Sequence, residues 1–252
     1  MITKNELLKY SSLLKKKGRK EENKFIVEGK RLVEEGLNSS FTLAALFSSV
    51  NFANSNPEFI AKYLNKGLEI LPGHDFERLC DTKTPQGIAA VFEIPDWTEQ
   101  VFGNGNLIVA LNDISDPGNA GTILRTCNWF GITEVLASEN TVDLFNPKLV
   151  RSSMGSLFHI LAKQSANIVR ELEELHKRDY RILVADTEGD NIYQFNPGGP
   201  AVIVFCNEAN GPSPEILRLT DKTITIPKYG RAESLNVASA AAVILSELRK
   251  VR

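Results

Sequence analysis

Two uninterrupted apolar runs constrain the fold of this 252-residue chain most strongly, residues 106–113 (NLIVALND) and 201–208 (AVIVFCNE). A strand with one solvent-exposed face alternates apolar and polar residues, whereas a continuous apolar run indicates a strand buried on both faces. Helical segments separate these runs from further short apolar ones, as residues 167–179 follow 157–163. The alternation predicts an α/β fold built from βαβ units, with a parallel or mixed sheet.

Expected strands and helices alternate in the first part of the chain and again in the second. The break between the two parts predicts two domains. Residues 94–106 (IPDWTEQVFGNGN) combine Pro, Gly and Asn and show no hydrophobic period, which is typical of a linker. We therefore expect a first α/β domain over residues 1–95, a linker over 96–105 and a second α/β domain over 106–252.

The first half contains four expected strands. They cover residues 24–29, 42–49, 68–72 and 87–95. Thr3 and Glu6 have capping-box spacing, so a helix is expected from there through Leu14. A charged turn broken by glycine is expected over residues 15–24. The remaining helices of this half are expected over residues 30–37, 57–67 and 75–81.

The second half restarts the pattern with more strands. They are expected over residues 106–113, 133–138, 157–163, 181–187, 201–208 and 223–227. The expected helices cover residues 122–131, part of 146–156, 167–179 and 234–250. The last helix is rich in alanine, and such small residues permit close packing against a neighbouring surface.

Composition excludes several classes of protein. Hydrophobic residues make up 42% and charged residues 24%, close to the average of soluble globular proteins. No apolar run is long enough for a membrane helix, and the polar start of the chain does not resemble a secretory signal. Cys80, Cys127 and Cys206 lie far apart without CxxC spacing. That pattern argues against a disulfide scaffold and a cysteine zinc site and fits the cytoplasm, and we expect no metal.

Positive charge is concentrated at the start of the chain. Residues 1–31 contain ten Lys or Arg and four Asp or Glu, although the whole chain has a net charge of −2. A basic arm on an acidic body favours a polyanionic partner. A solvated, lysine-rich helix end would produce the same pattern, and charge alone leaves both interpretations open.

Three polar segments follow expected parallel strands, where α/β folds bind their ligands. They are residues 111–125 (LNDISDPGNAGTILR), 204–217 (VFCNEANGPSPEIL) and 224–248, which begins ITIPKYGRAESLNV. Ordinary strand–helix turns with polar caps would explain each segment taken alone. The chain has no GxxxxGK[ST], HExxH, GxSxG or GxGxxG motif, so the familiar ATPase, metalloprotease, serine hydrolase and dinucleotide-binding classes lose support.

Taken together and in this order, the three segments resemble the signature motifs of the SpoU/TrmH family. This family is a branch of the SPOUT superfamily of S-adenosylmethionine-dependent RNA methyltransferases. The residues that carry the resemblance are Asn119, Gly121 and Arg125, then Asn207, Glu208 and Gly211, then Ile226, Pro227, Gly230, Ser234, Leu235, Asn236 and Val237. Residues 151–160 resemble the family segment between the first two motifs. Residues 24–37 and 79–95 are similar to an N-terminal substrate-binding domain like ribosomal protein L30e.

The resemblance implies an RNA (ribose-2′-O)-methyltransferase of EC class 2.1.1, acting on rRNA rather than tRNA. It also implies a C-terminal trefoil knot and a homodimer with the active site at the subunit interface. The catalytic group it implies is Asn119, Arg125, Glu208, Ser234 and Asn236. The implied cofactor contacts are Cys206, Gly211, Ile226 and Leu235. Together with the basic arm, it suggests RNA contacts by Lys15, Lys16, Lys17, Arg19, Lys20 and Arg151.

The sequence departs from the family pattern at three positions. Cys206 and Ala209 stand where glycine is commoner, and Lys228 replaces the usual methionine. A backbone contact to the cofactor tolerates a cysteine, and Lys228 would meet RNA phosphate or change the charge of the pocket. Three alternatives stay open: the same activity on tRNA, a non-catalytic RNA-binding ribosome-assembly factor, and a small-molecule α/β enzyme with an anion-binding loop after Asn112.

Overall fold

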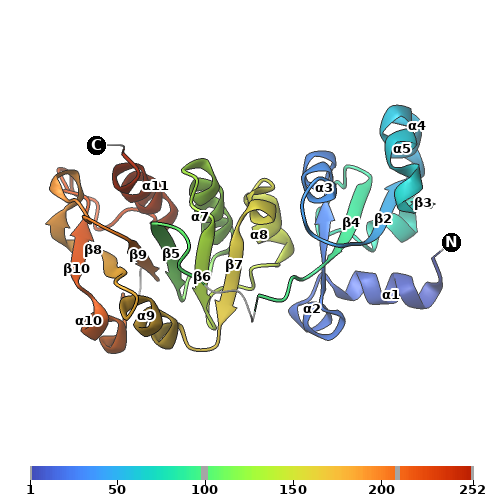
Figure 1. Ribbon diagram of the computed structural model, residues 1–252. Helices are drawn as coiled ribbons and strands as arrows, with labels where there is room; N and C mark the ends of the chain where they lie inside the picture. Colours follow the sequence, from blue (N-terminus) through green and yellow to red (C-terminus); the bar gives the residue numbers. More distant parts are fainter. Residues whose placement is uncertain (1, 98–101, 208–210, 251–252) are drawn as a thin grey trace. The chain divides into compact units, whose positions relative to one another are not determined.

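The computed structural model describes residues 2–97, 102–207 and 211–250, and it divides into two compact units (Figure 1). Unit 1 contains the chain up to Asp96 together with Phe145–Phe158. Unit 2 contains Trp97–Leu144 and the chain from His159 onward. We expected residues 145–158 within the second domain. They pack into unit 1 because Phe145 and Phe158 join an aromatic cluster around Phe25, with ring centroids 4.8 and 6.1 Å from it.

A four-stranded mixed sheet forms the centre of unit 1. In spatial order its strands are β1 (Lys24–Glu28), β4 (Ile88–Glu93), β2 (Leu43–Ser49) and β3 (Leu68–Leu71). Strand β4 is antiparallel to both of its neighbours, whereas β3 is parallel to β2. Because β4 lies between two strands, all of its side chains except that of Glu93 are buried.

Helices surround this sheet. They are α1 (Lys4–Ser12), α2 (Lys16–Glu22), α3 (Lys30–Leu37), α4 (Val50–Ser55), α5 (Pro57–Tyr63), η1 (Leu64–Lys66), α6 (Gly73–Glu77), α8 (Pro147–Ser152) and the start of η2 (Ser156–His159). The predicted capping box at Thr3 and Glu6 is confirmed. The charged turn predicted over residues 15–24 is wrong, because α2 occupies most of it. Its glycine, Gly18, permits close packing: a Cβ there would lie 2.2 Å from the Ser12 carbonyl oxygen.

Unit 2 contains a six-stranded sheet in which every paired strand is parallel. In spatial order its strands are β10 (Lys222–Thr225), β8 (Arg181–Asn191), β9 (Ala201–Cys206), β5 (Leu107–Asn112), β6 (Glu134–Ser138) and β7 (Leu161–Ser165). All residues of the adjacent strands β5 and β9 are buried, as their continuous apolar sequences predicted. Asn112 pairs with Cys206, so the first and second motif segments leave the sheet side by side.

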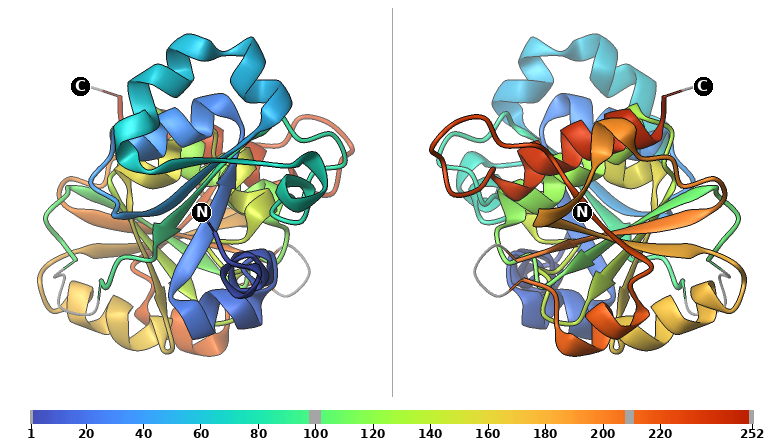
Figure 2. Two further views of the ribbon diagram at one scale, coloured as in Figure 1. Left: turned by 90° about the vertical axis from the view of Figure 1, so that its right-hand side faces the viewer. Right: turned by 90° about the vertical axis from the view of Figure 1, so that its left-hand side faces the viewer.

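Helices cover both faces of this sheet (Figure 2). They are α7 (Pro117–Trp129), α9 (Ile168–His176), α10 (Pro214–Leu219) and α11 (Val237–Leu248), with the short turn η3 (Ile192–Gln194). Helices α7 and α11 lie on one face, and α9 and α10 on the other (Figure 1). This arrangement confirms the predicted α/β class. No described helix is long and apolar enough to cross a membrane.

Two boundaries in unit 2 differ from the expectation. Helix α7 begins at Pro117 rather than Thr122, because the Asp116 carboxylate accepts the Asn119 N–H over 2.8 Å and caps the helix. Gly118 therefore lies in a helix rather than in a loop. The strand expected over 157–163 is also shifted: Leu157 and Phe158 lie in η2, and β7 starts at Leu161.

The expected linker is described only in part, since residues 98–101 lie outside the described ranges. Its end is anchored in unit 2 by Glu134, whose side chain is buried. This carboxylate accepts the backbone N–H groups of Gly103 and Gly105, both over 3.2 Å. A buried carboxylate requires such donors, so Glu134 fixes the backbone of the residues that lead into β5.

Candidate active site

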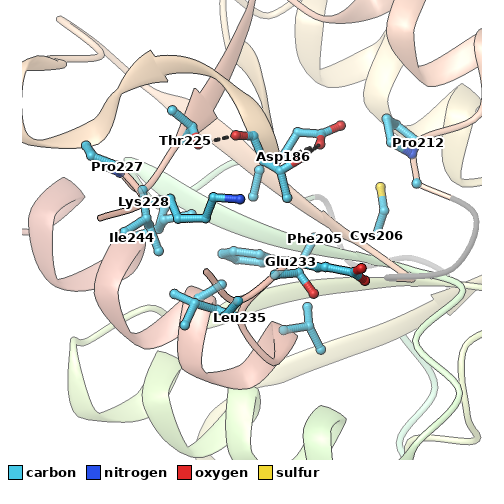
Figure 3. Close-up of a pocket in the computed structure, with 18 of the residues that line it drawn as sticks. Asp186, Phe205, Cys206, Pro212, Thr225, Pro227, Lys228, Glu233, Leu235 and Ile244 are labelled. Carbon is cyan, nitrogen blue, oxygen red and sulfur yellow. Dashed lines mark hydrogen bonds between the residues drawn. The ribbon is translucent and has the colours of Figure 1, made fainter. Parts of the chain in front are cut away.

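A pocket of about 440 Å³ lies where β8, β9 and β10 approach the start of α11 (Figure 3). Its floor and walls are largely apolar, with contributions from Phe205, Ile226, Leu235 and Ile244. The volume lies within the range of small-molecule sites. Aliphatic and aromatic side chains of this kind suit a flat heterocycle such as adenine.

All four residues predicted to hold the cofactor line this one pocket. They are Cys206, Gly211, Ile226 and Leu235. Cys206 ends β9, and Ile226 and Leu235 belong to the segment between β10 and α11. Gly211 has a φ of +62°, a left-handed conformation that glycine adopts without a steric penalty. Two motifs distant in sequence thus enclose the same space, and the residues fit S-adenosylmethionine in size and chemistry.

The predicted catalytic residues Asn119 and Asn236 are in contact. The Asn236 side-chain amide donates to Oδ1 of Asn119 over 3.0 Å, and its own Oδ1 accepts the Ala238 N–H. Asn236 therefore caps α11 and joins it to the first turn of α7. Ser234, two residues earlier, lines the pocket. The first and third motifs meet here at the edge of the pocket.

Arg125 lies two turns into α7, on the solvent-exposed side of the helix. It has no hydrogen-bond or ion-pair partner among residues 2–97, 102–207 and 211–250. Glu208, another member of the predicted catalytic group, lies outside the described residues, as does Ala209. The catalytic role of Glu208 stays a prediction.

A hydrogen-bond network at the end of β5 links the first and second motifs. Asp113 has a φ of +60°, an uncommon conformation for a residue with a side chain. Its carboxylate accepts the Ser138 hydroxyl over 2.7 Å, and its N–H donates to the same hydroxyl oxygen over 2.9 Å. The Asn207 side chain donates to the Asp113 carbonyl oxygen over 3.1 Å. The network holds both strand ends in a fixed position beside the pocket.

Sequence reasoning missed three charged residues that line the pocket: Asp186, Lys228 and Glu233. Asp186 follows the apolar residues of β8, so the rule that located the other motifs would have found it. Lys228 differs from the methionine that is usual in the family, and the sequence assigns it no contact with the cofactor. Glu233 lies inside the third motif segment, and the sequence assigns it no catalytic or binding role. Figure 3 shows the Lys228 side chain extending into the pocket toward Asp186 and Phe205.

The thiol of Cys206 faces this pocket but is not a nucleophile. Burial raises the pKa of Cys206 to about 12, and the negative charges of Asp186 and Asp113 contribute in the same direction. A thiol with such a pKa stays protonated at neutral pH. Cys206 therefore acts as part of the pocket wall.

The residues predicted to contact RNA fall into two groups. Lys15, Lys16, Lys17 and Lys20 are exposed around α2, although Lys17 lies 3.7 Å from Glu21. Arg19 is a correction: it is 2% exposed and donates to the Leu13 carbonyl oxygen over 2.6 Å. Its guanidinium holds the turn between two helices and does not face solvent.

Arg151 is a second correction. Its guanidinium lies 2.6 Å from the Asp81 carboxylate and 3.6 Å from that of Glu28, which is buried. The Glu28 carboxylate also accepts the Asp81 N–H and the Thr82 hydroxyl, over 2.6 and 2.7 Å. Two carboxylates offset the charge of Arg151, so a phosphate would have to compete with them for its guanidinium.

The fold, the pocket and the paired asparagines define an α/β enzyme with a small-molecule site at the carboxyl ends of parallel strands. Residues 106–246 match the SpoU rRNA Methylase family, and residues 5–90 match an MRM3-like substrate binding domain. This chain belongs to the SpoU rRNA methylase family. The predicted resemblance, the RNA 2′-O-methyltransferase class and the use of S-adenosylmethionine are thereby confirmed.

Three similar proteins extend this result along the whole chain. The 23S rRNA (guanosine(2553)-2′-O)-methyltransferase RlmP of Bacillus subtilis is 32% identical over 98% of this chain and 97% of its own length. The TrmH-family protein from Porphyromonas gingivalis is 32% identical, with a TM-score of 0.84 and 98% of each chain covered. The AdoMet-bound rRNA methyltransferase from Sinorhizobium meliloti is 26% identical, with a TM-score of 0.83 and coverage of 98% and 95%.

Proposed function

We propose that this enzyme methylates the ribose 2′-hydroxyl of a guanosine in 23S rRNA. The observation that carries the proposal is the 32% identity with RlmP, which extends over 98% of this chain and 97% of that enzyme. Such a match includes the substrate-binding region as well as the catalytic one. Substrate choice depends on both, so the shared length favours a shared type of RNA over tRNA.

The pocket residues position the reactants in this proposal. S-adenosylmethionine, when bound, supplies an activated methyl group for an in-line displacement. Backbone groups of Cys206, Ile226 and Leu235 hold the cofactor, and apolar neighbours exclude water. Holding two reactants in the correct orientation provides about 7–11 kcal/mol of the barrier reduction in favourable cases.

The polar residues beside the pocket act on the hydroxyl. Asn119 and Ser234 orient the 2′-oxygen, and Asn236 holds Asn119 through the 3.0 Å hydrogen bond. Arg125 stabilises the developing alkoxide by its positive charge, and Glu208 orients Arg125. A guanidinium keeps its proton in proteins and is a poor base, so charge stabilisation is the role we assign to Arg125.

RNA is held in two places in this proposal. Residues 1–95 form the substrate-binding domain, in which Lys15, Lys16, Lys17 and Lys20 contact phosphates. At the edge of the cofactor pocket, Tyr229 is 93% exposed, and Arg231 follows two residues later. An exposed aromatic ring near a cation suits stacking on an unpaired base, so this loop receives RNA near the target ribose.

We further propose a cytoplasmic homodimer whose catalytic domain has a trefoil knot. The exposed Trp129 at the end of α7 supports a subunit contact there, because its indole is 84% exposed. Large aromatic side chains in such positions are enriched at interfaces. The measurement is the molar mass in solution by light scattering, with Trp129→Ser as the variant.

The function is tested by incubating the purified protein with labelled S-adenosylmethionine and, separately, unmodified 23S rRNA and bulk tRNA, then mapping the label. We expect label on one guanosine ribose of 23S rRNA. Label in tRNA alone would replace 23S rRNA with the tRNA alternative. Cofactor binding without label in either pool would point to a precursor RNA as substrate, and absence of both would favour a non-catalytic assembly factor. Absence of salt-sensitive RNA binding would favour a small-molecule enzyme.

A further inference from the structure

Three charged side chains face a pocket that is otherwise mostly apolar. Asp186 comes from β8, whereas Lys228 and Glu233 come from the segment between β10 and α11. Neither Lys228 nor Glu233 has a hydrogen-bond or ion-pair partner in the described part of the chain. The three charges are therefore available to a ligand in the pocket.

One of the carboxylates is held in a fixed orientation. Oδ1 of Asp186 accepts the backbone N–H of Thr187 over 2.6 Å and its hydroxyl over 3.2 Å. Thr225 in turn donates to the Thr187 carbonyl oxygen over 2.9 Å, which connects the adjacent strands β8 and β10. Asp186 is exposed, so these local hydrogen bonds orient its carboxylate and leave it accessible to a ligand.

The charges of the pocket are the complement of those on S-adenosylmethionine. The cofactor carries two cationic groups, the sulfonium and the α-ammonium, and one anionic group, the carboxylate. The pocket presents two carboxylates and one ammonium. Phe205 and Leu235 lie beside them (Figure 3), so the pocket offers apolar and charged surface to different parts of one ligand.

We propose that Lys228 binds the carboxylate of the cofactor's amino-acid tail, and that Asp186 and Glu233 face its two cationic groups. The inference rests on the proposed function, since it takes S-adenosylmethionine as the ligand. It adds two consequences. Lys228 selects for a ligand with a carboxylate, and the two acids favour the sulfonium cofactor over its product S-adenosylhomocysteine, which keeps the ammonium and the carboxylate but has an uncharged sulfur.

The test is calorimetric titration of the purified full chain, without RNA, with four ligands. They are S-adenosylmethionine, S-adenosylhomocysteine, decarboxylated S-adenosylmethionine and 5′-methylthioadenosine, of which the last two lack the carboxylate. Lys228→Met should weaken the binding of S-adenosylmethionine and S-adenosylhomocysteine by at least about tenfold, as expected for the loss of a charge-assisted hydrogen bond. The same variant should bind the two ligands that lack the carboxylate as tightly as the wild type does. Lys228→Arg should preserve the preference, and Lys177→Met, a surface change after α9, serves as the matched control.

The acids are tested by the ratio of affinities for the cofactor and its product. Glu233→Gln and Asp186→Asn keep the shape of the side chain and remove its charge. Each should lower the preference for S-adenosylmethionine over S-adenosylhomocysteine, and an unchanged ratio in both variants would overturn their part of the proposal.

The other outcomes are equally decisive. If Lys228→Met weakens the binding of all four ligands equally, or of none of them, Lys228 does not bind the carboxylate. In that case the wild-type protein still binds the cofactor and methylates RNA, so the proposed function survives. A wild-type protein that binds none of the four ligands would overturn the proposed function and this inference together.

Discussion

Asn236 donates its side-chain amide to Oδ1 of Asn119 over 3.0 Å, across 117 positions of sequence. The same Asn236 accepts the Ala238 N–H over 3.0 Å and so caps α11. One side chain thus begins the last helix and fixes a residue at the start of α7. The geometry of the active site and the stability of a helix depend on the same group.

Replacing Asn236 by alanine should therefore reduce both turnover and stability. Loss of a helix cap costs about 1 kcal/mol. Asn167 is a matched control, because it caps α9 by accepting the Arg170 N–H over 3.1 Å and lies outside the pocket. Asn167→Ala should cost similar stability in urea unfolding while leaving turnover intact. Equal turnover in the two variants would argue against a role for Asn236 in the site.

Arg125→Ala should reduce turnover by about a hundredfold or more, as the loss of a charge that stabilises a developing oxyanion typically does. Binding of S-adenosylmethionine should persist, because Arg125 does not line the cofactor pocket. Single-turnover rates and calorimetry measure the two effects, with Arg170→Ala on α9 as control. Joint loss of binding and turnover would indicate misfolding and remove the assigned role.

The four exposed lysines around α2 should contribute to RNA affinity by neutralising phosphates. Changing Lys15, Lys16, Lys17 and Lys20 to glutamine should lower the slope of log affinity against log salt by about 0.7–0.9 for each phosphate that is no longer neutralised. Filter binding at several salt concentrations gives the slope, and Lys177→Gln should leave it unchanged. A slope equal to the wild type would place the RNA elsewhere.

Arg19 should behave differently from its lysine neighbours. Because its buried guanidinium donates to the Leu13 carbonyl oxygen, Arg19→Ala should lower the midpoint of thermal unfolding. The salt slope of the folded variant should match that of the wild type. A reduced slope at unchanged stability would show that Arg19 reaches RNA after all.

The cysteines should make the fold sensitive to alkaline pH. Burial raises the pKa of Cys206 and of Cys80 to about 12, and it raises the pKa of Cys127 as well. Raised folded-state values keep stability intact below the ordinary thiol pKa and remove it as pH rises, because the unfolded chain loses protons first. Urea midpoints should be flat up to about pH 8 and fall above about pH 9. Cys127→Ala should reduce the fall.

The same pKa directions predict slow thiol chemistry. At pH 8 the native protein should react with a disulfide reagent far more slowly than the urea-unfolded protein, in which all three thiols are accessible. Cys80 is half-buried, whereas Cys127 and Cys206 are buried, so fast labelling of Cys127 or Cys206 in the native protein would contradict this prediction.

The sequence by itself determined the features that depend on local pattern. Continuous apolar residues made β5 and β9 recognisable as strands buried on both faces, and Thr3 with Glu6 predicted the start of α1. The order and spacing of the three motifs identified the family and the residues Cys206, Gly211, Ile226 and Leu235, which all line one pocket. Each of these signals is complete within a short stretch of chain.

Only the tertiary structure decided which groups are buried and with what they pair. Arg19 and Arg151 are indistinguishable from RNA-binding arginines in sequence, yet one is buried against Leu13 and the other lies between Asp81 and Glu28. Residues 145–158 lie inside a family motif region but pack into unit 1. Asp186 and Lys228 line the same pocket although 41 intervening residues separate them. Burial and charge pairing depend on distant residues, and no local pattern records which ones will meet.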